Sequence, residues 1–180
     1  LDLPFLGVQF VVEKVTYQDK YFLRPFGQSP GTPYKIELRH GSSGMQNTVP
    51  LLAILKHFAQ DFDFEKAFKR SVLEFLYSAD RLTDFKPAAN LGSLSKRIYV
   101  HIEEPELGLF PDAQCALMNE LVRQSFIEKT NPLSMIMATH SPYILNHLNL
   151  LIKAHDTNNT EFTNGARLYF DNIAAYHMAD

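Results

Sequence analysis

The sequence predicts an α/β protein with a parallel sheet and an N-terminal antiparallel β meander. A strand-like run at 98–102, a helical pattern from about 112 to 128 and a second apolar run at 134–139 follow one another. This order is typical of a parallel βαβ unit with a right-handed crossover. The first forty residues contain three runs rich in β-branched and aromatic residues, separated by short polar stretches. Such runs favour antiparallel strands.

Composition predicts one folded core. The chain has 180 residues, of which 46% are hydrophobic and 21% are charged, enough for a single globular domain. The net charge of -3 does not favour binding to nucleic acid or to an anionic membrane. A single cysteine, Cys115, cannot form an internal disulfide, and no transmembrane or secretory segment is visible. We therefore expect a cytoplasmic, soluble protein with no membrane contact.

The middle of the chain predicts helices. Apolar residues recur at helical spacing in residues 41–60 and again in 63–82. Pro50 is expected to kink or restart the first of these helices. Residues 85–96 are rich in Pro, Gly and Ser and are typical of a loop, and the tail from 166 to 180 predicts a hairpin or an edge strand.

Two adjacent carboxylates, Glu103 and Glu104, end the first strand of the βαβ unit in "IYVHIEEPELGLFP". In a parallel sheet, functional groups collect at the carboxyl ends of the strands. Neighbouring ionised carboxylates repel each other and resist desolvation, so a cation is expected beside them. Mg²⁺ on a phosphate fits, because this ion takes one or two carboxylates together with water and phosphate oxygens. Without further evidence, "EEPE" also suits an acidic surface loop.

Two further segments supply groups that suit a phosphate. His140 follows the second strand in "MATHSP" and is expected at the same edge of the sheet, where it can donate a hydrogen bond to a terminal phosphate. The segment "GSSGMQ" begins an apolar helix, and a helix N-terminus with the hydroxyls of Ser42 and Ser43 favours an anion. Considered separately, this segment is an ordinary helix cap.

Taken in order, "SSGMQ", "IYVHIEEPELGLFP" and "MIMATHSP" resemble the C-terminal half of an ABC-type ATPase of the OLD, RecF-like and AAA-family ATP-binding protein groups. The resemblance implies a P-loop NTPase fold, of which this chain would be the C-terminal lobe. It also implies a single partial ATPase domain in three parts. These are a β meander at 1–40, a signature helix with a helical insertion at 41–97, and a Walker B to switch-histidine core with a C-terminal tail at 98–180.

The resemblance implies a role at the nucleotide site for each matching residue. "PELGLFP" takes the place of the D-loop. The matching residues are Ser42, Ser43 and Gly44 of the signature, which bind the nucleotide of a partner subunit, Glu103 for Mg²⁺, Glu104 as the catalytic glutamate and His140 as the switch histidine.

The sequence also departs from the family pattern. Glu103 stands where many ATPases have Asp, and His101 interrupts the Walker B strand, where we interpret it as a satisfied, partly buried histidine. No G-x-x-x-x-G-K-[ST] motif and no Gly-Lys pair occurs. Because the chain opens at Leu1 and lacks this motif, we expect a C-terminal segment whose upstream lobe carries Walker A.

The leading hypothesis is an ATP-binding and ATP-hydrolysing domain that uses Mg²⁺ and forms a head-to-tail homodimer on binding ATP, with the isolated chain inactive. Nucleic acid would be a partner of the full protein only, since this segment does not indicate it. The first alternative is a catalytically inactive ATPase-like module that binds proteins. The second is a metal site built from His101, Glu103 and His140.

Overall fold

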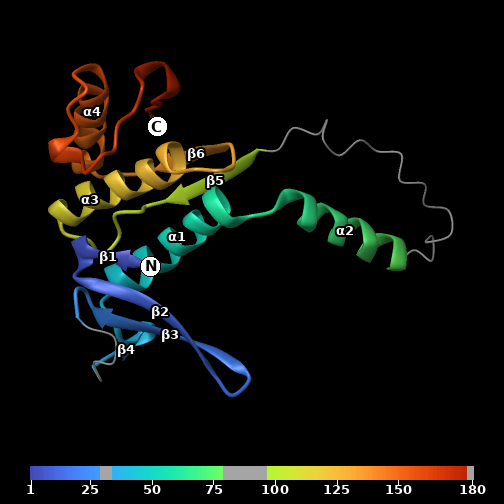
Figure 1. Cartoon of the computed structure of the whole chain (residues 1–180). Helices are drawn as coiled ribbons and strands as arrows, with labels where there is room; N and C mark the ends of the chain where they lie inside the picture. Colours follow the sequence, from blue (N-terminus) through green and yellow to red (C-terminus); the bar gives the residue numbers. More distant parts are fainter. Residues whose placement is uncertain (29–33, 79–96, 178–180) are drawn as a thin grey trace.

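The computed structural model describes residues 1–28, 34–78 and 97–177. It confirms a mixed α/β architecture with one four-stranded antiparallel sheet and one two-stranded parallel sheet. Figure 1 shows the antiparallel sheet at one end of the molecule, α4 at the other, and α1 and α3 between them. The predicted loop at 85–96 lies outside the described residues.

The predicted meander is confirmed as an antiparallel sheet with the order β1-β2-β3-β4. Its strands are β1 (Asp2–Leu3), β2 (Val8–Val15), β3 (Gln18–Pro25) and β4 (Ile36–Glu37). The third predicted run is shorter than expected, because the chain leaves β4 after two residues and forms a 3-10 turn at Leu38–His40. Leu3 and Leu23 are buried and attach the sheet to the core.

Both helices predicted in the middle of the chain are present. α1 (Ser43–Lys56) continues into a π-helical turn at His57–Asp61, and α2 (Phe64–Ser78) follows. Of the two effects expected of Pro50, a kink or a restart, the restart is wrong, since Pro50 lies inside the continuous helix α1. Its missing N–H leaves a single helical carbonyl without its donor, and the helix tolerates this loss.

The strand–helix–strand unit consists of β5 (Ile98–Glu103), α3 (Pro111–Val122) with a π-helical turn at Arg123–Ile127, and β6 (Leu133–Ala138). β5 and β6 pair in parallel from Ile98↔Leu133 to Glu103↔Ala138, as predicted. The outer face of this pair is exposed. Tyr99 and Ile136 are 65% and 60% exposed, because no described element covers the outer face of the pair.

A helix that sequence reasoning did not predict follows β6. α4 (Pro142–Asp156) begins directly after Ser141, whose hydroxyl accepts a hydrogen bond from the Ile144 N–H. Beyond α4, the chain forms 3-10 turns at Glu161–Thr163 and Phe170–Asn172. The predicted hairpin or edge strand in the tail is therefore wrong for the described residues up to 177.

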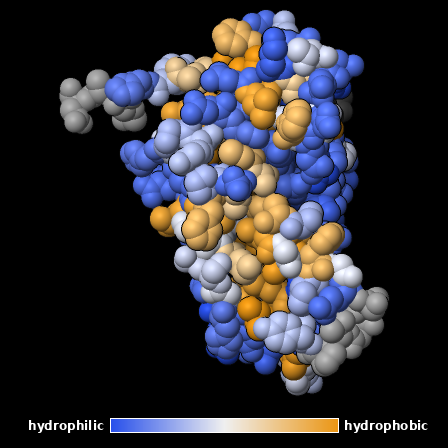
Figure 2. All heavy atoms as spheres, turned by 90° about the vertical axis from the view of Figure 1, so that its left-hand side faces the viewer, coloured by the Kyte–Doolittle hydropathy of each residue, from blue (hydrophilic) through white to orange (hydrophobic). Residues whose placement is uncertain are grey.

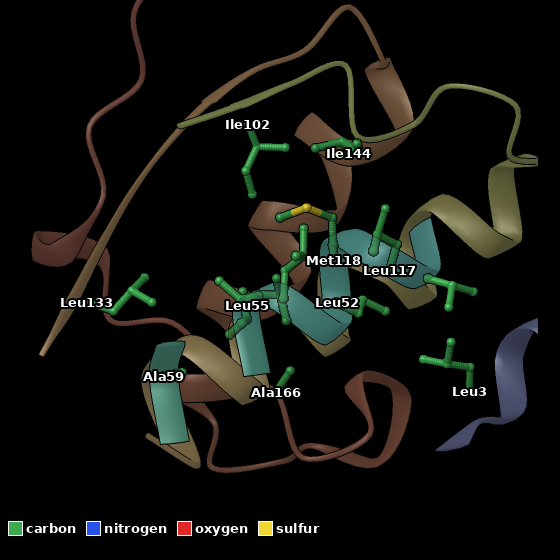
Figure 3. Packing of buried hydrophobic residues seen from close by; sticks show 14 of the residues in the cluster. Leu3, Leu52, Leu55, Ala59, Ile102, Leu117, Met118, Leu133, Ile144 and Ala166 are labelled. Carbon is green, nitrogen blue, oxygen red and sulfur yellow. The ribbon is translucent and has the colours of Figure 1, made fainter. Parts of the chain in front are cut away.

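One hydrophobic core joins the parallel pair to the helices. Figure 3 shows buried side chains from β1, β5, β6, α1, α3 and α4 packed together. They include Leu3, Leu52, Leu55, Ile102, Leu117, Met118, Leu133 and Ile144. This packing fixes α1 and α3 relative to β5 and β6, and so determines where the turns after the two strands lie.

A buried polar pair joins α3 and α4. The ring nitrogen Nε2 of His147 lies 2.6 Å from Oδ1 of Asn119, and both side chains are buried. Burial lowers the pKa of His147, because the imidazolium form loses hydration. The pair therefore joins the first half of α4 to α3 through a neutral imidazole. In the part of the chain that the structure describes, no helix has the length and apolar character needed to cross a membrane.

Leu52 offers a test of this core. Replacing it with Ala should lower the free energy of unfolding by about 2–5 kcal/mol, because the side chain is fully buried and its loss leaves a cavity. Ile54 lies in the same helix but is 58% exposed, so Ile54→Ala should change stability by about 0.5 kcal/mol or less. Urea unfolding followed by circular dichroism compares the two. Equal losses would show that α1 does not pack as described.

Candidate functional site

The turn after β5 holds Glu104 in an unusual backbone conformation. Its φ of 45° lies in the left-handed region, which costs a non-glycine residue about 1–2 kcal/mol. Two hydrogen bonds compensate: the Glu104 N–H donates to the Ala138 carbonyl (2.9 Å), and the Glu104 carbonyl accepts from the Leu107 N–H (3.0 Å). The turn is thus fixed directly to the end of β6. Strained residues held in this way are common at functional sites.

His140 lies against this turn from the end of the neighbouring strand. Its Nε2 is 3.7 Å from Oε1 of Glu104, beyond hydrogen-bond distance but close enough for one water or one phosphate oxygen to contact both. The side chains remain accessible, with 89% of His140 and 52% of Glu104 exposed. Two of the residues predicted for the nucleotide site therefore lie side by side and face solvent.

Glu106 joins the two turns, and sequence reasoning did not single it out. Its Oε1 accepts hydrogen bonds from the Thr139 hydroxyl (2.7 Å) and from the His140 N–H (2.9 Å). Partial burial raises the pKa of Glu106, but the hydrogen bonds from Thr139 and the backbone amides outweigh it, so the pKa lies below its ordinary value of 4.5. The carboxylate is therefore ionised at neutral pH. The available sequence signal was a third carboxylate directly after Pro105.

A hydrogen-bond network continues from Thr139 to the start of α3. The Ser141 N–H donates to the Thr139 hydroxyl (3.0 Å), and the Ser141 hydroxyl donates to Oε1 of Gln114 (2.5 Å). The Gln114 amide then donates to the Leu109 carbonyl (2.9 Å). The network closes on the segment that contains Glu106, so both neighbours of His140 are held by side chains.

The predicted signature segment contacts the same loop. Ser42 caps α1 by accepting a hydrogen bond from the Met45 N–H (3.3 Å). Gly44 is buried, and a Cβ placed there would lie only 2.4 Å from the Gly108 carbonyl oxygen. A Cβ on Gly108, whose φ is 76°, would lie 2.7 Å from the Ser43 hydroxyl. The N-terminus of α1 and the predicted D-loop therefore pack together through two glycines.

Glu103 and His101 lie on the outer face of β5. Both are exposed, since alternate residues of a strand share a face and no described element covers this one. The expectation of a partly buried His101 is therefore wrong. Among the described residues, no group of three or more His, Cys, Asp or Glu side chains is arranged to hold a metal ion. Glu103 remains available for an ion that takes most of its ligands from phosphate and water.

Comparison of the chain with protein-family models, curated proteins and solved structures finds no match. The residues at the ends of β5 and β6 are therefore the basis for a functional proposal.

The close contact between Gly44 and Gly108 predicts an unusual effect of Gly44→Ala. In an exposed helix, this change stabilises by about 0.5–1 kcal/mol, because Ala is the better helix former. Here it should destabilise instead, since the new Cβ would overlap the Gly108 carbonyl and force the two segments apart. Thermal unfolding measures the sign, with Asn47→Ala at an exposed position of α1 as the control. A rise in melting temperature for Gly44→Ala would contradict the close contact.

Proposed function

We propose that this chain supplies the Walker B, signature and switch-histidine half of an ATP-hydrolysing site of the ABC type, within a P-loop NTPase fold. The observation that carries the proposal is the placement of Glu104 and His140 at the ends of adjacent parallel strands, 3.7 Å apart. A carboxylate and an imidazole at that spacing can contact an attacking water and a terminal phosphate together.

In the proposed reaction, Glu104 orients a water molecule toward the γ-phosphorus and accepts its proton as the new P–O bond forms. The bond from the γ-phosphorus to the bridging oxygen breaks, which releases ADP and inorganic phosphate. His140 donates a hydrogen bond to a γ-phosphate oxygen, where negative charge is concentrated. Mg²⁺, held through Glu103 and water, would neutralise charge on the phosphate oxygens when bound.

The sequence contains no G-x-x-x-x-G-K-[ST] motif, the loop that cradles the phosphates in P-loop NTPases. We propose that a Walker A lobe of the same protein supplies this loop. The N-terminus of α1 would then bind the nucleotide of a second subunit, as the signature of a head-to-tail homodimer. Ser42 and Ser43 are exposed at the start of a 14-residue helix, where a phosphate is favoured.

The surface around the site favours a protein partner. Figure 2 views the side on which α3 and α4 begin and shows apolar side chains gathered in a band across it. Large apolar residues exposed on these segments include Leu107, Phe110 and Tyr143. An exposed apolar patch of this kind favours an interface. It also supports the second candidate function, an inactive ATPase-like module that binds proteins without hydrolysis.

Titration of the isolated chain with ATP distinguishes the proposed ATPase site from the inactive interaction module. We expect negligible ATP binding and no hydrolysis. Glu104 and His140 would contact only the terminal phosphate, and the lobe proposed to hold the rest of the nucleotide is missing from the isolated chain. Isothermal titration calorimetry with ATP and Mg²⁺ should be run beside a protein in which the chain is joined to its Walker A lobe. Micromolar binding by the isolated chain would contradict an ABC-type site. Absence of binding in both proteins would favour the interaction module.

Glu104→Gln tests the catalytic assignment in the protein joined to its Walker A lobe. Glutamine keeps the shape of the side chain but cannot accept the proton, so turnover should fall by about 100-fold or more while ATP binding persists. Asp112→Asn, an exposed carboxylate near the start of α3, is the matched control and should hydrolyse ATP at the parental rate. Parental turnover in Glu104→Gln would remove this residue from the mechanism.

A further inference from the structure

We propose that Glu106 is a positioning residue that sets His140 against Glu104 for phosphoryl transfer. The inference rests on the proposed function and extends it to a third carboxylate, which itself contacts neither water nor nucleotide in the proposed reaction. The observation that supports it is that one carboxylate oxygen, Oε1 of Glu106, joins the turn after β5 to the residues directly after β6.

The bonds of Glu106 act beyond the end of the strand ladder. The last backbone bond between the two turns runs from the Glu104 N–H to the Ala138 carbonyl. After that point, Oε1 of Glu106 accepts hydrogen bonds from the Thr139 hydroxyl (2.7 Å) and from the His140 N–H (2.9 Å). Bonds to an ionised carboxylate are stronger than bonds between neutral groups. Glu106 thereby fixes the backbone of the residue whose imidazole must reach the phosphate.

The two residues beside His140 in the sequence, Thr139 and Ser141, are also held by side-chain hydrogen bonds. Thr139 is held by Glu106, and Ser141 is held by Thr139 and by Gln114. The imidazole is left 89% exposed. The backbone is therefore constrained on both sides while the ring stays accessible, which is the arrangement that a group reaching toward an incoming phosphate requires.

Stability alone is a poor explanation for a carboxylate at this position. The second oxygen, Oε2 of Glu106, is buried and has no hydrogen-bond partner in the part of the chain that the structure describes. A buried polar atom left unpaired is destabilising. The bonds to the charged Oε1 are stronger than bonds to a neutral acceptor, and their strength at His140 is the feature that stability alone does not explain.

Steady-state hydrolysis tests the role in the protein joined to its Walker A lobe. Glu106→Ala should lower kcat by about tenfold or more with KM nearly unchanged, because it disturbs an interaction used in the transition state rather than in binding. Glu106→Gln should lose less of kcat than Glu106→Ala, since its amide oxygen can accept both bonds, but it should not restore the parental rate because it lacks the charge that strengthens them. Asp112→Ala is the matched control and should behave as the parent.

Amide hydrogen exchange in the 180-residue chain gives a readout independent of activity. Glu106→Ala should speed exchange at the His140 amide by about tenfold or more, while amides of β5 and α3 exchange as in the parent. Equal acceleration throughout the chain would show a merely structural role and overturn the proposal. Unchanged kcat in Glu106→Ala, whatever the exchange result, would also overturn it. If the parental joined protein does not hydrolyse ATP, the proposed function itself fails.

Discussion

The parallel pairing of β5 with β6 is the constraint on which the candidate site depends. It aligns Glu103 with Ala138, so the two strands end at the same level and the residues that follow them lie close together. The bond from the Glu104 N–H to the Ala138 carbonyl extends this alignment by one residue and holds Glu104 in a left-handed conformation. A shift of one residue in register would move Glu104 away from His140 and reverse which side chains face the core.

The core and the site are connected through the helices that cover the inner face of this pair. Leu117 and Met118 of α3 belong to the same buried cluster as Ile102 of β5, and the start of α3 carries Gln114, which supports the segment around His140. Gly44 brings α1 against Gly108 in the loop after β5. The groups proposed for chemistry are thus exposed, whereas the residues that position them are buried or attached to buried elements.

Local patterns in the sequence predict much of this arrangement, and contacts between distant segments account for what they miss. The apolar runs of β5 and β6 and the helical spacing of α3 are local, so the parallel pair and the positions of Glu104 and His140 could be predicted. The role of Glu106 depends on Thr139, 33 residues further along the chain, and no local pattern indicates that contact. Ser141 and Pro142 are a recognisable helix start, and α4 was missed although this signal was present. His101 was misjudged because alternation along a strand does not show which face is covered.

The open face of β5 and β6 affects how self-association of this chain should be interpreted. Parallel strands are almost always covered on both sides, yet Tyr99 and Ile136 present apolar surface to water here. Two copies at high concentration can bury these faces against each other without any nucleotide. A dimer that forms in the absence of ATP and weakens when Tyr99 is made polar would therefore report on this sheet face, and would say nothing about pairing through the start of α1.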